Sequence, residues 1–294
     1  MQLIERSLRG MCHRIARVRG GPRLVERVRR HYAKHYAGGS DSLIVLDDFD
    51  GDLKFRVDRA SYMGSLIYWR GYHSRPQLMC LDRFLQPHMV FADVGANHGE
   101  FTTFAAKRLG QGKVLAFEPL EENYRWLVEN VQLNRFPNVL TYQLGLSDRP
   151  GEVDFFTSND TRLFGSSHEG LATMFPGGDR TAYAGRAQVD VFDDVFRETG
   201  LRRLDGMKID VEGAELSVLR GARQSIQRHQ PFILVEINAE TYQAAGYCKK
   251  DLCEFLQGLD YQVFNIGRHG DWVPINADQL FDLCNVLWLP RTFS

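Results

Sequence analysis

Long apolar runs are absent from this sequence. No stretch approaches the ~18–20 residues that a membrane-spanning helix needs. The N-terminal residues mix apolar side chains with arginines, unlike the continuous apolar core of a secretory signal. Hydrophobic residues make up 44% of the chain and charged residues 25%, which is typical of globular domains and argues against disorder. The 294 residues are enough for one large domain or two small ones.

Paired cysteines and metal-ligand spacings are also lacking. The five cysteines are an odd number without a CxxC pair, which is a poor framework for disulfides or zinc. The nine histidines show no metal spacing, and neither a GxSxG elbow nor a P-loop is present. These absences exclude a nucleophile-elbow hydrolase and a P-loop nucleotide site. We expect a reduced, cytoplasmic protein.

Charge is distributed unevenly. Residues 1–40 carry ten arginines and lysines but two glutamates, a net +8, which leaves −9 on the rest of a chain whose total is −1. Apolar residues recur at helical spacing from Ile4 to Val18 and again from Leu24 to Tyr36, on either side of Gly20-Gly21-Pro22. The pattern predicts two basic amphipathic helices. Such an arm either docks on an anionic inner-membrane surface or packs on its own domain or a second subunit. Because the body is acidic, we do not expect nucleic-acid binding.

The rest of the chain divides into a lead-in, 41–88, and a larger α/β domain, 89–294. In the lead-in, a turn at Asp47–Asp52 separates two apolar stretches and predicts a hairpin, and a helix is expected to end before Pro87. The α/β domain alternates strands and helices, which predicts a mostly parallel sheet with helices on both faces. The expected strands are Met89–Val94, Val114–Phe117, Val139–Leu144, Gly206–Ile209, Phe232–Ile237, Tyr261–Ile266 and Asn285–Leu289. Expected helices begin near Gly99, Glu121, Asp190, Gly213 and Cys248. No helix fits between the last two strands, so we expect them to pair as an antiparallel edge hairpin.

The first strand runs into a glycine-rich loop with glycines at positions 95 and 99, followed by a helix. Glycine lets the backbone approach a ligand, and the helix N-terminus offers free N–H groups. A dinucleotide loop uses GxGxxG, whereas this loop has GxxxG spacing and Asp93 at the strand end. A carboxylate there repels phosphate but suits a sulfonium and an amino group. The loop therefore favours S-adenosylmethionine over NAD, unless it is only a structural turn.

The second strand ends in Glu118-Pro119, nineteen residues beyond Gly99. An acidic side chain at this point accepts hydrogen bonds from ribose hydroxyls. Glu118 also precedes the helix expected at Glu121, so it is a candidate helix cap as well. The two roles are compatible.

The fourth strand ends with three charged residues in alternation, Lys208, Asp210 and Glu212. Ligands bind at the carboxyl ends of strands in open α/β sheets, so these side chains are expected where substrate meets cofactor. The alternative is a solvated loop with a capping carboxylate. Asp210 together with Glu236 and Asn238, at the end of the next strand, offers oxygen ligands for one divalent cation. We do not expect a metal, because the same groups serve equally to bind substrate hydroxyls or to cap loops.

In these motifs the chain resembles the FkbM family of S-adenosylmethionine-dependent methyltransferases, over about residues 59–238. The resemblance rests on the four segments Asp93–Thr102, Phe117–Pro119, Gly145–Asp148 and Lys208–Glu215. It implies a Rossmann-like class I sheet of seven strands, ordered 3-2-1-4-5-7-6 with strand 7 antiparallel. The cofactor-binding residues that it implies are Asp93, Gly95, Ala96, Asn97, Gly99, Phe101 and Thr102 around the methionine end, Glu118 at the ribose, and Ser147 and Asp148 near the adenine.

The resemblance also implies methyl transfer to a hydroxyl of a sugar, glycan or related secondary-metabolite acceptor. Asp210 or Glu212 is the expected base or acceptor-orienting group, with Lys208 assisting. The chain departs from the family pattern in its basic first 40 residues and at His73, where members often carry glutamate. Residues 157–186 are expected to form a loop or hairpin over the active site, with Phe156, Phe164 and Phe175 as candidates for stacking on a sugar.

Two other functions are carried as alternatives. One is an NAD-dependent oxidoreductase, which the missing GxGxxG and the missing Tyr-x-x-x-Lys pair disfavour. The other is a non-catalytic scaffold on the same fold, with the basic arm as a membrane-docking surface. Intact charged motifs at three strand ends argue against the scaffold.

Overall fold

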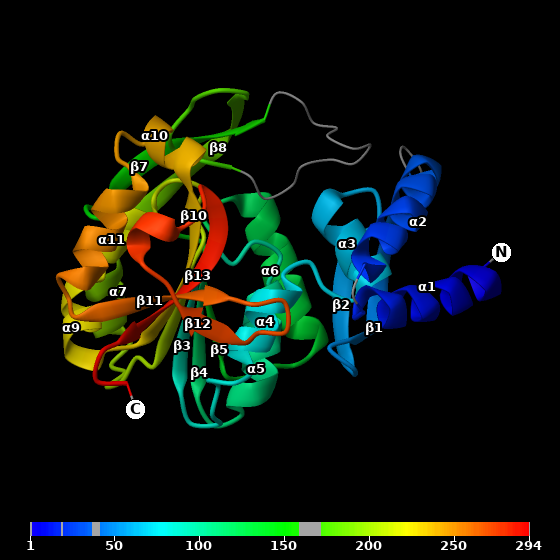
Figure 1. Cartoon of the computed structure of the whole chain (residues 1–294), viewed down its shortest axis with the longest axis horizontal. Coiled ribbons are helices and arrows are strands. Elements are labelled where there is room, and N and C mark those ends of the chain that lie inside the picture. The colour runs from blue at the N-terminus through cyan, green and yellow to red at the C-terminus, as the bar shows by residue number, and fades with distance from the viewer. Residues whose placement is uncertain (1, 19, 37–41, 159–171, 294) are drawn as a thin grey trace. The chain divides into compact units, whose positions relative to one another are not determined.

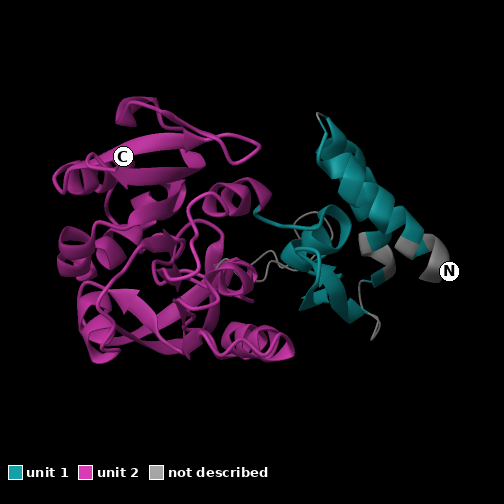
Figure 2. Cartoon of the chain, turned by 90° about the horizontal axis from the view of Figure 1, so that it is seen from below, with its two compact units in different colours: residues 1–74, 160–170 teal, residues 75–159, 171–294 magenta. Residues whose placement is uncertain are grey.

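The computed structural model describes residues 2–18, 20–36, 42–158 and 172–293. These residues form two compact units, one up to Ser74 and one from Arg75 onward (Figure 2). The sequence-based division had boundaries after residues 40 and 88. In the structure, the basic arm and the hairpin belong to one unit, and the helix near residue 78 belongs to the other. No described helix has the length and apolar character that crossing a bilayer requires.

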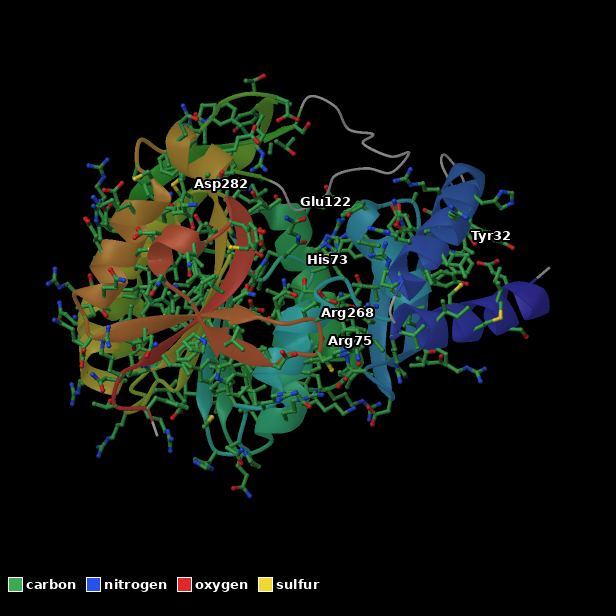
Figure 3. The ribbon with its side chains drawn as sticks, viewed as in Figure 1. Tyr32, His73, Arg75, Glu122, Arg268 and Asp282 are labelled. Carbon is green, nitrogen blue, oxygen red and sulfur yellow. The ribbon has the colours of Figure 1, made fainter. Side chains whose placement is uncertain are left out.

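The described residues of the first unit form three helices and a hairpin. Its elements are α1 (Gln2–Ala16), α2 (Gly21–Tyr36), β1 (Leu43–Phe49), β2 (Leu53–Asp58) and α3 (Tyr62–Arg70). The two basic helices and the antiparallel hairpin are confirmed. Part of the basic charge is buried inside this unit, since fully buried Arg29 donates to Ser65 Oγ at 3.0 Å. Tyr32, labelled in Figure 3, packs on Trp69 with ring centroids 4.8 Å apart. Contact of this unit with a membrane or a second subunit stays a prediction.

The second unit is built on one mixed sheet of eight strands. In spatial order they are β12 (Trp272–Pro274), β11 (Tyr261–Ile266), β13 (Leu283–Pro290), β10 (Phe232–Asn238), β9 (Gly206–Ile209), β3 (Val90–Val94), β4 (Lys113–Phe117) and β5 (Val139–Tyr142). Strands β5, β4, β3, β9 and β10 are parallel, and β13 is antiparallel to both of its neighbours. This is the class I order 3-2-1-4-5-7-6, which confirms the predicted fold class.

Two details of the sheet correct the prediction. The sheet has eight strands instead of seven, because β12 pairs antiparallel with β11 at the edge. The last two expected strands do pair antiparallel, but β13 lies inside the sheet between β10 and β11 and is not an edge strand. The segment joining β11 to β13 is polar and contains Gly and Pro, and it still supplies the three residues of β12.

Helices cover both faces of the sheet (Figure 1). Successive residues of β3 point to opposite faces of the sheet. Val90, Ala92 and Val94 lie in the core on one face. The helices that pack there are α7 (Phe192–Glu198), α8 (Glu215–Gly221), α9 (Arg223–His229) and α11 (Lys249–Gln257). Phe91 and Asp93 point to the opposite face. The helices α5 (Glu100–Leu109) and α6 (Glu121–Leu133) cover the strands β3, β4 and β5. Helix α4 (Arg75–Leu81) ends earlier than expected, six residues before Pro87.

A small second sheet adjoins this domain. It has the order β6 (Gly145–Ser147), β8 (Arg180–Val191) and β7 (Gly151–Ser158). The segment 157–186, expected as a loop or hairpin, is extended in part, because β8 begins at Arg180 and Phe156 bridges to Thr173. Residues 159–171, which include Phe164, lie outside the described residues. A short helix, α10 (Ala239–Ala244), follows β10.

Candidate active site

The loop between β3 and α5 is held by the neighbouring strand. The N–H groups of Gly95 and Ala96 both donate to the carbonyl of Phe117, at 3.1 and 2.9 Å. Gly95 has a φ of +76°, and an added Cβ would overlap the carbonyl oxygen of Asp210. A glycine is therefore required here both by conformation and by space. The loop is thereby tied directly to the segment that carries Asp210.

Asp93 occupies the end of β3 and is fully buried. Its Oδ2 accepts a hydrogen bond from Thr102 Oγ1 at 2.5 Å, across the first turn of α5. Its Oδ1 is buried without a hydrogen-bond partner among the described residues, and Lys208 Nζ lies 3.7 Å away. Burial raises the pKa of Asp93, although the Lys208 ammonium opposes this. Asp93 Oδ1 is thus paired with the Lys208 ammonium but accepts no hydrogen bond from the described residues.

Glu118 closes the other side of the loop. Its Oε2 accepts from the backbone N–H of Asn97 at 2.9 Å, and its Oε1 accepts from that of Leu120 at 3.1 Å. Asn97 is held in the left-handed region, with φ of 49°, and its buried Oδ1 has no hydrogen-bond partner among the described residues. Burial raises the pKa of Glu118 to about 7. Glu118 thus contacts the glycine-rich loop and Leu120, the residue before α6, but its side chain does not cap that helix. Its role at the ribose stays a prediction.

Lys208 lies between the loop and the acidic residues. Its Nζ donates to the carbonyl oxygen of Gly95 at 2.7 Å and lies 3.6 Å from Asp210 Oδ2. Burial disfavours its ammonium, but the carboxylates of Asp210 and Asp93 outweigh burial and raise its pKa. The ammonium also lies 5.3 Å from the ring centroid of Phe101. These contacts make Lys208 a support of the loop, with Asp210 within its electrostatic reach.

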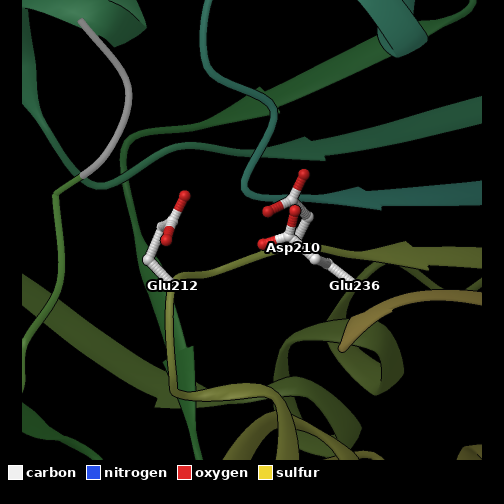
Figure 4. Close-up of side chains that lie close together, drawn as sticks. All are labelled: Asp210, Glu212 and Glu236. Atoms are coloured by element: carbon white, nitrogen blue, oxygen red, sulfur yellow. The ribbon is translucent and has the colours of Figure 1, made fainter. Parts of the chain in front are cut away.

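Three carboxyl groups converge beyond Lys208 (Figure 4). Asp210, Glu212 and Glu236 each place an oxygen within 4.8 Å of the others. Burial and the neighbouring Asp210 raise the pKa of Glu212 to about 7, and the same two causes raise the pKa of Glu236 to about 10. Both shifts favour the protonated form of the carboxyl group. The cluster brings three carboxyl groups with different degrees of burial into one small volume.

Glu212 is held in a constrained position. Its φ is +54°, in the left-handed region, and its Oε2 accepts from Arg180 Nη1 at 2.6 Å. The next acid, Glu215, shapes the same loop: its carboxylate accepts from the N–H groups of Val211 and Gly213, both at 2.9 Å. Strained non-glycine backbone of this kind occurs where surrounding contacts enforce it, often at active sites.

The remaining candidates lie at the margins of this arrangement. Ser147 is buried at the end of β6, whereas Asp148 is exposed. An added Cβ on Gly145, at the start of that strand, would lie 3.5 Å from Pro119, so β6 begins beside the residue after Glu118. The side-chain oxygen of Asn238 accepts from Thr241 N at 3.5 Å and caps α10.

The sequence profile described as "Methyltransferase FkbM domain" matches residues 93–263, more than half of the chain. The chain belongs to this family. Methyltransferase sdnD of Sordaria araneosa is 30% identical over 226 residues, covering 66% of this chain and 82% of the relative. Hexuronic acid methyltransferase AglP of Haloferax volcanii is 29% identical over 192 residues, covering 63% of this chain and 69% of the relative. AMB antimetabolite synthetase AmbE of Pseudomonas aeruginosa is 30% identical over 227 residues, covering 67% of this chain; the chain spans 10% of that longer protein.

Membership of the FkbM family confirms the predicted enzyme class, an S-adenosylmethionine-dependent methyltransferase, and removes the NAD-dependent alternative. The residues around the loop fit this cofactor. Two buried oxygens, Asp93 Oδ1 and Asn97 Oδ1, are available as acceptors, which suits the donors of an amino group. Gly95 leaves no room for a side chain, and the Glu118 carboxylate lies at the second strand end. The role of each residue stays a prediction.

Sequence reasoning missed Arg180, the ion-pair partner of Glu212 in this FkbM domain. Arg180 lies 32 residues before Glu212 and follows a segment without recognisable periodicity, so no spacing connected the two. Glu215 ends the motif Lys208–Glu215, but the sequence assigned it no role. Its carboxylate, held by two loop N–H groups and by Tyr247 OH at 3.3 Å, was not expected to be structural.

Proposed function

We propose that this protein transfers the methyl group of S-adenosylmethionine to a hydroxyl oxygen of a sugar, glycan or related secondary-metabolite acceptor. The observation that carries the proposal is the convergence of Asp210, Glu212 and Glu236 next to the glycine-rich loop. A relative whose name states hexuronic acid methylation, AglP, supports a carbohydrate acceptor. An alcohol is a poor nucleophile at neutral pH, so a hydroxyl acceptor needs the proton-accepting groups that this cluster supplies.

When bound, S-adenosylmethionine supplies a methyl group on a sulfonium, which needs no further activation. The protein has to orient the acceptor oxygen and take its proton. A pKa of about 7 suits Glu212 to accept that proton at neutral pH. Asp210, with a third of its side chain exposed, is the second candidate base. Lys208 contacts both the carbonyl oxygen of Gly95 and the carboxylate of Asp210, so it fixes Asp210 relative to the loop.

Oxygen ligands for a divalent cation are also present in this cluster. A cation between Asp210, Glu212 and Glu236 would lower the acceptor's pKa and replace the protein base. Two positive side chains, Lys208 beside Asp210 and Arg180 on Glu212, already supply charge to the same carboxylates. We therefore propose a metal-independent reaction, for which turnover unchanged by EDTA is the expected result.

The test is transfer of labelled methyl from S-adenosylmethionine to a panel of hydroxyl acceptors, by the wild type and by Asp210→Asn and Glu212→Gln. We expect kcat to fall by about 10²–10⁴ in the variant that lacks the base, with cofactor affinity retained. Glu254→Gln, an exposed change on α11, is the matched control. Full activity in both site variants would refute the assignment of the base. Cofactor binding without methyl transfer to any acceptor would favour the scaffold function.

A further inference from the structure

Helices α1 and α2, in the first unit of Figure 2, use their apolar faces inside that unit. The two helices pack on each other and on α3, and Cys12 and Ala16 of α1 and Val25 of α2 are buried. An amphipathic helix that lies in a bilayer turns its apolar face to the lipid instead. In this fold those apolar faces are occupied, so a partner of α1 and α2 has to bind their outward surface.

The two acids of α1 and α2 are engaged within the same unit. Glu5 accepts from Arg59 Nη1 at 3.0 Å. Glu26 is paired with Arg29 Nη2 at 2.8 Å and with Arg70 Nη2 at 2.7 Å. These partners neutralise both glutamates, so the outward surface of the two helices keeps most of its positive charge.

Four arginines on this outward surface have no ion pair with the described residues. They are Arg14, Arg17, Arg23 and Arg27, all exposed. A fifth exposed arginine, Arg30, is paired with Glu26 at 2.9 Å. The exposed acids among the described residues of this unit belong to the hairpin of β1 and β2: Asp47, Asp48 and Asp52. The outward surface of α1 and α2 therefore suits an anionic partner.

Three apolar side chains are exposed in the same helix–turn–helix segment. Met11 is 48% exposed, Val18 58% and Leu24 50%. Met11 and Arg14 lie on one face of α1 by their spacing, and Val18 and Leu24 flank the turn between the helices. Single apolar side chains on a surface are ordinary, but these three are grouped with the arginines. The four arginines and the three apolar side chains together are called the basic surface below.

We propose that the basic surface docks this protein on an anionic lipid bilayer. The arginines bind anionic headgroups, and Met11, Val18 and Leu24 enter the layer beneath them. A bilayer offers both kinds of contact, whereas a nucleic acid would satisfy the arginines and leave the apolar side chains in water. The proposal concerns the first unit and does not depend on the identity of the methyl acceptor.

The test measures, by co-sedimentation, how the whole chain partitions between buffer and large vesicles. The vesicles are phosphatidylcholine alone, or phosphatidylcholine with about 30% phosphatidylglycerol. We expect binding to the anionic vesicles, weakened by high salt because salt screens exposed charges. Each arginine near an anionic surface contributes about fivefold to the partition coefficient, so the double variant Arg23→Gln, Arg27→Gln should lower it about 25-fold. The double variant Arg14→Gln, Arg17→Gln makes the same test on α1.

Two further variants separate the apolar contact from the charge. Val18→Ser with Leu24→Ser keeps every arginine and should lower the partition coefficient at least about fivefold, because it removes apolar area that the bilayer buries. Arg202→Gln with Arg228→Gln is the charge-matched control, since it removes two exposed arginines from the second unit. This control should stay within about twofold of the wild type.

Equal partition of the wild type onto both kinds of vesicle overturns the proposal, as does wild-type partition of both arginine double variants. Unchanged binding of the serine variant overturns the insertion of the apolar side chains. Self-association that the arginine variants abolish, without vesicle binding, would assign the basic surface to a second copy of the chain and overturn the proposal as well. Binding of a DNA duplex in place of vesicles would also overturn it.

Discussion

Replacing Lys208 by methionine removes the cation that lies between the buried Asp93 and the partly exposed Asp210. Its Nζ lies 3.7 Å from Asp93 Oδ1 and 3.6 Å from Asp210 Oδ2, and its side chain is 8% exposed. Two unit charges 3.7 Å apart interact by about 4.5 kcal/mol at an effective dielectric constant of ~20. Loss of one partner from a buried pair costs ~3–5 kcal/mol for the same reason. For a domain of this size we expect the melting temperature to fall by about 6–20 °C.

The pH dependence identifies the cause of this loss. Burial already raises the pKa of Asp93, and without Lys208 that pKa rises further. The folded variant then binds a proton that the unfolded chain does not, so its deficit relative to the wild type shrinks as pH falls. Thermal unfolding at pH 8 and pH 5 measures both effects, with the exposed Lys250→Met as control. A decrease in melting temperature of less than about 2 °C, or an equal decrease at both pH values, would refute the reasoning.

Two further predictions concern the cofactor loop. Gly95→Ala should weaken S-adenosylmethionine binding at least tenfold by calorimetry, because the added methyl overlaps the Asp210 carbonyl and the φ is left-handed; wild-type affinity would contradict this. Burial raises the pKa of Glu118 from its ordinary value of 4.5 to about 7. In the folded protein its carboxylate therefore ionises only near neutral pH, and the ionised form is the better acceptor for ribose hydroxyls. Affinity should therefore rise between pH 6 and pH 8 more steeply in the wild type than in Glu118→Gln, and parallel profiles would exclude Glu118 from the ribose site.

The same raised pKa of Glu118 sets the sign of its effect on stability. Its folded-state pKa exceeds the unfolded value, so the folded protein binds more protons between about pH 4.5 and 7. The contribution of this group to the free energy of unfolding consequently falls as pH rises through that window.

Much of the fold followed from periodicity. Gly206–Ile209 and Tyr261–Ile266 were predicted with the bounds that β9 and β11 have, because each is a short apolar strand next to turn residues. The strand order came from family resemblance, since alternation alone leaves the order of a parallel sheet open. Strand β12 was missed because its three residues lie in a polar segment, where pairing with β11 and not local pattern makes the strand.

The positions of the site residues could be predicted from the sequence, but the ion pairs between them could not. Asp93, Lys208 and Asp210 were expected at neighbouring strand ends, and the parallel register of β3 and β9 places both acids within 4 Å of Lys208 Nζ. The ion pair of Arg180 with Glu212 depends on how a hairpin folds over the sheet, and no spacing encodes that. Likewise, helix α4 ends at Leu81 although Phe84 and Leu85 are buried, since apolar residues outside a helix can fill the same core.

The most direct test of the central claim is calorimetric titration of the wild type, Asp93→Ala and the exposed control Glu122→Gln with S-adenosylmethionine and, separately, with NAD. Micromolar S-adenosylmethionine binding by the wild type and the control, its loss in Asp93→Ala and no NAD binding are the predicted results. An Asp93→Ala variant that stays folded and binds S-adenosylmethionine as tightly as the wild type would contradict the account.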